Sequence, residues 1–240
     1  MNKNFITAFS VSLLLIANIG IFAQDSTKTK AKIDLGADLV SRYLWRGQLY
    51  DATPNVQPFI NLERGGLKFG AWGSYGMLSN FGEVDLSLSY TYKWFTIQAN
   101  DYFFIPDEKA EKYKYFNFDS KSTKHSIEGA LIFEGGEKFP LKLTLASFLY
   151  GDDRDSLGNN YYSTYFEAAY PFNIENIEMN VFVGITDKEN IYGNGIGLIN
   201  TGISACKKIK INKDFDIPIT CSLVSNPQAE SIFFILMVSF

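Results

Sequence analysis

Residues 83–93 read EVDLSLSYTYK, and this stretch decides the fold. Val84, Leu86, Leu88, Tyr90 and Tyr92 alternate with polar or charged residues. Successive side chains of a β-strand point to opposite faces. The stretch is therefore predicted to be a strand with one apolar face and one polar face.

The same alternation recurs along the chain and predicts twelve strands. Their expected ranges are 33–48, 55–63, 67–77, 83–93, 95–105, 125–133, 141–150, 161–170, 177–186, 197–207, 216–224 and 230–240. Most have about ten residues, the length of a tilted strand that crosses the hydrocarbon of a bilayer. We expect an all-β protein, an antiparallel transmembrane β-barrel of about twelve strands, within a range of about 10–14.

The predicted connections differ in length between the two ends of such a barrel. Short turns occur at 64–66, 93–94 and 135–140, whereas the alternate connections at 106–123, 151–160 and 187–196 are longer and more polar. Short turns on one side and long loops on the other are typical of transmembrane barrels. One connection, 208–215, is long for its side, so a strand boundary there is expected to differ.

The last strand alternates apolar residues up to a terminal Phe240, an ending that outer-membrane barrels present to their assembly machinery. A secreted β-sandwich is the alternative, because Phe233, Ile235 and Met237 on the other face are apolar too.

The first 23 residues have the pattern of a secretory signal peptide: Lys3, an apolar stretch and a small residue, Ala23. A retained anchor helix is the alternative. The predicted domains are then a signal peptide (1–23), a flexible polar lead (24–32) and the barrel (33–240). The protein is expected in the bacterial outer membrane, in contact with its lipid.

Composition excludes two classes of protein. Hydrophobic residues make up 46% and aromatic residues 16% of the 240 residues, too many for a disordered chain. The net charge of -4 argues against nucleic-acid binding, which requires clustered basic residues.

Charged residues on the polar faces predict the lining of the lumen. Asp34, Asp38, Arg42 and Arg46 alternate along 33–48, and an arginine facing the bilayer midplane costs about 2–4 kcal/mol, so they are expected to point inward. The candidate channel-lining residues are Asp38, Arg42, Arg46, Lys68, Glu83, Asp85, Lys93 and Glu128. Two interpretations stay open for Arg42 and Arg46: they line a pore with a transverse field, or they form salt bridges inside a packed lumen.

Aromatic residues are expected on both faces. A first group shares the inward phase and predicts a narrow bore: Phe59, Trp72, Tyr102, Phe104, Phe148, Tyr150, Tyr165 and Phe182. A second group near strand ends is expected to point outward, into the interfacial girdles: Tyr43, Trp45, Tyr75, Tyr90, Tyr92 and Trp94.

Catalytic and metal-binding patterns are weak. His125 is the one histidine, and its neighbour Ser126 would point to the opposite face of a strand. The Asp152, Asp153 and Asp155 group lacks the spacing of a calcium loop and is interpreted as a solvated loop. We predict no enzyme activity, cofactor or metal; a lipid- or peptide-cleaving barrel that uses His125 is the weaker alternative. A disulfide between Cys206 and Cys221 is disfavoured because their expected faces differ.

Several short motifs occur in order near the start of the barrel: SRYLWRG at 41–47, Pro54, Gln57-Pro58, GAWGS at 70–74, and EVD at 83–85 leading to Tyr90. In these motifs the chain resembles the TorF-like porins, a bacterial outer-membrane family, over about residues 34–101. The resemblance implies an outer-membrane barrel with a pore role and carries over no catalytic residues. Gln48-Leu49 departs from the Ser-Gln pair common in that family.

The function predicted from the sequence is a passive channel for small polar or charged solutes, assembled through Phe240 and with its oligomeric state open. The alternative is a plugged structural or adhesive barrel that binds a partner through its external loops, above all 106–123 with its aromatic residues Tyr113, Tyr115, Phe116 and Phe118.

Overall fold

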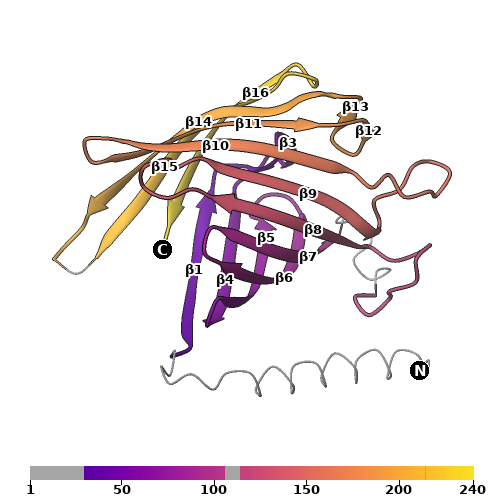
Figure 1. Ribbon diagram of the computed structural model, residues 1–240, viewed down its shortest axis with the longest axis horizontal. Helices are drawn as coiled ribbons and strands as arrows, with labels where there is room; N and C mark the ends of the chain where they lie inside the picture. Colours follow the sequence, from indigo (N-terminus) through magenta and orange to yellow (C-terminus); the bar gives the residue numbers. More distant parts are fainter. Residues whose placement is uncertain (1–29, 106–113, 214) are drawn as a thin grey trace. The chain divides into compact units, whose positions relative to one another are not determined.

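The computed structural model describes residues 30–105, 114–213 and 215–240 (Figure 1). The predicted signal peptide, most of the predicted lead and part of the 106–123 loop lie outside these residues. The described residues form an all-β protein whose wall is a closed antiparallel barrel of twelve strands, as the alternating pattern predicts. None of them forms an apolar helix of membrane-spanning length.

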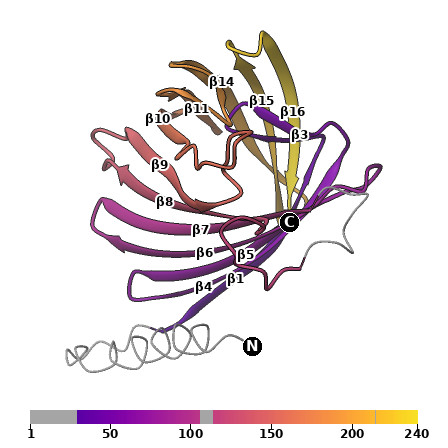
Figure 2. The same ribbon diagram turned by 90° about the vertical axis from the view of Figure 1, so that its right-hand side faces the viewer.

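The barrel strands follow one another around the wall in chain order, and the barrel closes where β1 pairs with β16 (Figure 2). The twelve are β1 (Lys32–Val40), β4 (Asn55–Arg64), β5 (Leu67–Gly76), β6 (Gly82–Tyr92), β7 (Phe95–Ile105), β8 (His125–Glu134), β9 (Lys142–Gly151), β10 (Thr164–Ile174), β11 (Ile177–Thr186), β14 (Gly197–Lys210), β15 (Asp216–Asn226) and β16 (Ser231–Ser239). Two short hairpins are separate from this sheet: β2 (Tyr43–Trp45) with β3 (Gln48–Asp51), and β12 (Glu189–Asn190) with β13 (Gly193–Asn194).

Connections of different length gather at the two ends of the barrel. The end that carries the C-terminus, here called the turn end, has the connections 65–66, 93–94, 135–141, 175–176 and 211–215. The other end, here called the loop end, has 41–54, 77–81, 106–124, 152–163, 187–196 and 227–230. The three connections predicted to be long all lie at the loop end, as expected, but 77–81 and 227–230 at the same end are no longer than 135–141 and 211–215 at the turn end. At the unusual 208–215 connection, β14 continues to Lys210, which leaves only 211–215 as a turn.

The two faces of the wall differ in polarity. Residues paired across adjacent strands point to the same face, and one inner row runs through Asp34, Asn61, Gly70, Ser87, Asn100 and Glu128. The outer face carries large apolar side chains that are open to the surroundings, such as Leu35 at 72% exposed and Phe95 and Phe234 at 62%. The barrel is thus polar inside and apolar outside.

Three sequence predictions about the wall are wrong. The first strand ends at Val40 and not at residue 48, so Tyr43 and Trp45 are not outward girdle residues. Tyr150 is not inward: the register of β8 and β9 shifts between Ile127 and Glu128, and Tyr150 pairs with Ile127 on the outer face. A one-residue shift in register moves the following side chains to the other face.

Candidate functional site

The segment between β1 and β4 folds into the lumen instead of extending the wall. The Trp45 indole packs edge-on against Tyr102 and Phe148, with ring centroids 5.3 and 6.4 Å apart. Both partners occupy inner-face positions of β7 and β9. Across the barrel, the Asn226 side chain of β15 donates a hydrogen bond to the carbonyl oxygen of Gly47 at 3.2 Å. The β2–β3 hairpin therefore spans the lumen between facing parts of the wall.

The tip of this hairpin is a two-residue turn made by Arg46 and Gly47. Both residues have positive φ, 48° and 75°, the backbone geometry of a type I′ hairpin turn. A Cβ at Gly47 would lie 1.9 Å from the carbonyl oxygen of Ile199, so only glycine fits against β14. The turn thus places the Arg46 side chain in the lumen and presses the backbone of Gly47 against the wall.

Arg46 is held by a buried carboxylate. Its guanidinium forms a two-pronged ion pair with Glu128, which is fully buried on β8. It also donates to the Tyr192 hydroxyl at 2.6 Å and lies over the Tyr165 ring, 4.5 Å from the centroid. Because buried charges are tolerated when they are paired and hydrogen-bonded, this cluster fixes the hairpin tip.

The Glu128 carboxylate has further donors from the neighbouring strand. Its Oε1 accepts hydrogen bonds from the Asn100 amide at 3.1 Å and the Tyr102 hydroxyl at 3.0 Å. Asn100 and Tyr102 lie on the inner face of β7 beside Glu128. The strand wall is therefore preorganised to receive the arginine.

A second anchor holds the base of the hairpin at the loop end. The Asp51 carboxylate accepts hydrogen bonds from the Ser79 hydroxyl at 2.5 Å, the Thr53 backbone N–H at 2.9 Å and the Asn55 amide at 3.0 Å. Burial alone would raise the pKa of Asp51, but these hydrogen bonds lower it below its ordinary value of 3.8. Asp51 thus ties β3, the start of β4 and the 77–81 loop together in its charged form.

Two carboxylates lie on the inner face of β6, next to the aromatic rings of the hairpin. Glu83 forms a hydrogen bond with Tyr43, whose ring centroid is 5.5 Å from that of Trp72. Glu83 also forms a hydrogen bond with Asp85, which accepts another from the backbone N–H of Phe103, although the single atoms Glu83 Oε2 and Asp85 Oδ1 are buried without a partner. The two carboxyl groups are therefore held by each other, by the hairpin and by the neighbouring strand β7.

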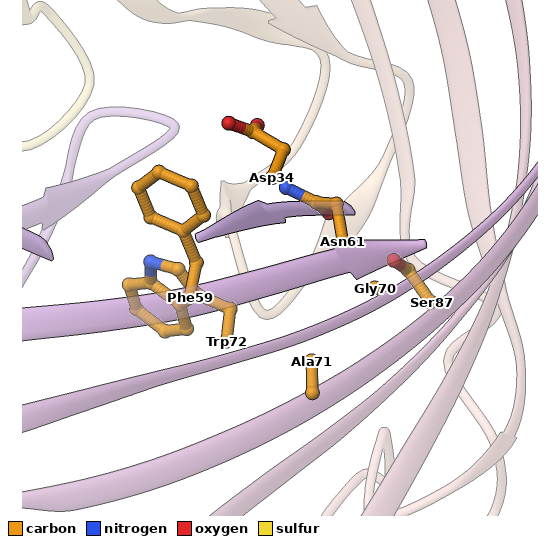
Figure 3. A pocket seen from close by; sticks show the side chains of 7 residues that line it. All are labelled: Asp34, Phe59, Asn61, Gly70, Ala71, Trp72 and Ser87. Atoms are coloured by element: carbon orange, nitrogen blue, oxygen red, sulfur yellow. The ribbon is translucent and has the colours of Figure 1, made fainter. Parts of the chain in front are cut away.

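The lumen also contains open space around the hairpin. A cavity of about 300 Å³ is lined by β1, β4, β5 and β6, with Phe59 and Trp72 among its residues (Figure 3). A second cavity of about 370 Å³ lies between the hairpin, including Arg42, and the wall of β10–β16, including Ser222. The hairpin thus narrows the lumen without filling it.

The structure places five of the eight candidate lining residues on the inner face of the wall: Asp38, Lys68, Glu83, Asp85 and Glu128. The other three lie off the wall. Arg42 and Arg46 face the lumen as expected, but they lie beyond β1, in the inward-folded segment, and Lys93 is in the β6–β7 turn with φ of 56° and not on a strand. The sequence left two roles open for these arginines, pore lining and internal salt bridging. Arg46 forms an internal salt bridge, whereas Arg42 forms no ion pair within the described residues.

His125 lies on the outer face near the loop end, under residues of the 114–124 loop. Its Nδ1 is 2.8 Å from Asp101, its Nε2 faces the carbonyl oxygen of Tyr115, and its ring stacks on Phe118 at 4.3 Å. Both ring nitrogens contact acceptor oxygens, so the hydrogen bonds are complete when both carry protons. This arrangement fastens the loop to the barrel.

The acidic 152–155 loop is built from internal contacts. Asp152 pairs with Lys124 at 2.8 Å, and Asp155 accepts backbone hydrogen bonds from Leu157 and Asn159. Asp153 differs from the predicted solvated residue, because it is buried and accepts a hydrogen bond from the Ser163 N–H at 2.9 Å. Within the described residues, no group of His, Cys, Asp and Glu side chains could hold a metal.

The two cysteines are free and point to opposite faces. Cys206 pairs with Thr220 on the inner face, whereas Cys221 pairs with Ala205 and Leu236 on the outer face. The two cysteines therefore do not form a disulfide, because they lie on opposite faces of the wall, as the sequence predicts.

The chain matches no family model, and the searches of curated proteins and of solved structures found no match. The resemblance to the TorF-like porins stays a prediction.

Sequence reasoning missed the hairpin, although one signal for it is present. The predicted first strand had 16 residues (33–48), whereas the others had about ten. The extra residues of the predicted first strand are those that leave the wall and form the hairpin. Tyr192, which contacts Arg46 from the 187–196 loop, has no local signal in the sequence.

Proposed function

We propose that this chain is a bacterial outer-membrane channel for small polar solutes, with a bore narrowed by the β2–β3 hairpin. The apolar outer face supports insertion into a bilayer, because an apolar surface of this extent marks a membrane or interaction surface. The aromatic residues Tyr90, Tyr92 and Trp94 gather near the turn end, at 47%, 62% and 59% exposed, as expected for an interfacial girdle.

The observation that carries the proposal is that the hairpin lies inside the lumen but is not a strand pair of the wall. Its two strands pair with each other and not with the wall. At its tip, the contacts to the wall include one buried ion pair, Arg46 with Glu128, and one hydrogen bond from Asn226. An element that is separate from the barrel sheet and anchored to it narrows the bore while the wall stays closed, and the width of a bore limits which solutes pass.

A variant that lacks the hairpin tests this function. Val40 and Asn55 are Cα partners on adjacent strands, so a two-residue Asn-Gly turn can replace residues 41–54 and keep the β1–β4 ladder. We expect the purified wild-type chain to give small discrete conductance steps in a planar bilayer. The shortened chain should give steps that are several-fold larger, because the lumen has lost its constriction.

A plugged barrel that binds a partner through its external loops is the second candidate. It is favoured by the exposed Phe116, 82% open on a loop that His125 fastens to the barrel. In that case the wild-type chain would be silent and only the shortened chain would conduct. Silence from both chains, each with β-rich circular dichroism, would contradict the channel.

A further inference from the structure

We propose that the cavity between the inward-folded segment 41–54 and the wall of β10–β16 binds a small oxyanion, the carboxylate or phosphate group of a solute, with Arg42 as its main ligand. The inference deepens the proposed function, on which it rests, by naming the class of solute that the lumen binds. Binding is measured without conduction, so the failure of the site and the failure of the channel can be told apart.

Backbone hydrogen bonds fix the point where Arg42 enters the lumen. The Ser41 N–H donates to the Leu236 carbonyl oxygen at 2.8 Å, and the Ser41 hydroxyl accepts from the Leu236 N–H at 3.0 Å. These contacts continue the register of β1 and β16 by one residue beyond Val40. Arg42 therefore follows beside Ile235, and both residues line the cavity.

The inner-face row that Arg42 extends carries uncharged polar groups. Going around the wall, the Cα partners in this row are Ile235, Ser222, Ser204 and Asn180. Side chains on paired positions of adjacent strands lie within contact distance. Ser222 and Asn180 line the cavity, and so does Thr220 in the next row. Hydroxyl and amide groups donate hydrogen bonds to an oxyanion, as an arginine does.

The Arg42 guanidinium has no counter-charge in the described part of the chain. It forms no ion pair there, and its Nε is buried without a hydrogen-bond partner. A buried N–H group is normally hydrogen-bonded, because its removal from water is unfavourable. Arg46 lines the same cavity, but Glu128 neutralises it. An oxyanion beside Arg42 would supply both the missing charge and the missing acceptors.

Glu167 is a carboxylate that lines the same cavity, at a distance from this row. Its Cα partner on β11 is Gly184, whereas Asn180 lies four residues earlier on that strand. Four residues of a strand span about 13 Å, and Phe182 occupies the inner-face position between them. Glu167 Oε2 already accepts a hydrogen bond from the Asn200 amide at 3.1 Å. The carboxylate therefore has its own donor and is separated from the row of the proposed site.

The remaining lining of the cavity suits the carbon skeleton of a small solute. The cavity measures about 370 Å³, and the apolar side chains of Val40, Leu44 and Met237 line it beside the polar groups. Sites for small molecules commonly have this size and combine an apolar lining with a few polar anchors.

A zwitterion such as an amino acid is the other class of solute, with a charge for both Arg42 and Glu167. One carbon separates the ammonium from the carboxylate group in an α-amino acid, which is short for rows that lie about 13 Å apart. The spacing of the rows therefore favours a simple oxyanion, and a zwitterion becomes an outcome of the test.

Trifluoroacetate reports binding through its fluorine NMR signal. The refolded chain in detergent micelles is mixed with sodium trifluoroacetate, with sodium chloride at equal ionic strength as reference. We expect a saturable broadening of the fluorine signal that sodium acetate or inorganic phosphate reverses. Separate competition by acetate and by phosphate shows which of the two sources of the oxyanion the site prefers.

Variants of the row test the role of each ligand. Arg42→Gln should weaken trifluoroacetate binding about 10- to 100-fold, because it removes the charged donor. Arg42→Lys keeps the charge but loses the planar fork and should restore part of the binding. Ser222→Ala should weaken binding about 2- to 10-fold. Arg64→Gln changes an exposed arginine at the end of β4 and should leave binding unchanged.

Three binding results would each overturn the inference: equal binding by Arg42→Gln and wild type, competition by chloride as effective as that by acetate, or glycine binding that Glu167→Gln weakens. Because Arg42 has no ion pair to lose, Arg42→Gln should unfold in urea at the same midpoint as Arg64→Gln. Loss of the fold in Arg42→Gln would make Arg42 a structural residue and would also overturn the site. Binding by a chain that is silent in bilayers would overturn the channel and support the site, whereas conduction without binding would do the reverse.

Discussion

Arg46 and Glu128 are 82 residues apart in the chain, yet their side chains form a two-pronged ion pair inside the lumen. The arginine comes from the tip of the β2–β3 hairpin and the carboxylate from the wall strand β8. The contact therefore joins the hairpin that folds into the lumen to the barrel around it.

Glu128→Gln is expected to destabilise the protein strongly. It would leave the Arg46 guanidinium in a buried site without its carboxylate, which typically costs about 3–5 kcal/mol of unfolding free energy. Urea-induced unfolding in detergent micelles measures this loss. Glu178→Gln breaks an exposed ion pair with Lys208 and should change the unfolding free energy little. Equal effects of the two variants would contradict the role of Glu128.

Gly47→Ala is expected to displace the hairpin from the wall. The added Cβ would meet the Ile199 carbonyl oxygen at 1.9 Å, and the backbone has the positive φ that disfavours a side chain. Trp45 should then become more exposed, with a red shift of its emission in a chain whose other tryptophans are phenylalanine. Gly65→Ala also has positive φ but meets nothing within 4 Å. It should leave Trp45 emission unchanged, and a shift of the same size there would count against the prediction.

Asp51 should make the hairpin base sensitive to acid. Because the folded-state pKa of Asp51 is lowered, its contribution to stability is complete above its ordinary value of 3.8 and is lost as the pH falls through the folded value. Unfolding of wild type and Asp51→Asn, followed from neutral to acid pH, measures the contribution. The stability difference between the two proteins should shrink on acidification, and a difference that stays constant would refute the assignment.

The two cysteines should report on the two faces of the wall. In lipid vesicles, a charged thiol reagent that does not cross membranes should modify Cys206, which faces the lumen, and spare Cys221, which lies on the outer face that the proposed function places in lipid. Cys206→Ser and Cys221→Ser allow the two positions to be followed separately by mass spectrometry. In urea both should react. Rapid modification of Cys221 in vesicles would contradict the membrane placement of the outer face.

The sequence predicts the wall well because the wall follows a rule of period two. In strands such as β6, the alternation of apolar and polar residues is enough to predict both the strand and the face of the wall to which each side chain points. The hairpin breaks that rule: Arg42 and Arg46 keep the spacing of strand residues, so the pattern by itself extends β1 through them. Only tertiary contacts, with Glu128 and Tyr192 distant in the chain, reveal that the segment turns inward.

The closure of the barrel has a mechanical consequence. Most neighbouring wall strands pair over eight or more positions, whereas β1 and β16 pair over three, from Asp38 to Val40. In the described part of the chain, no barrel strand pairs with residues 32–36 on the β16 side. Strand separation under load should therefore begin along this short seam, since fewer backbone hydrogen bonds must break there than between other neighbours. Strands β1 and β16 thus share the shortest seam of the wall, to which backbone hydrogen bonds between Ala37 and Phe240 and from Ser41 to Leu236 add little length.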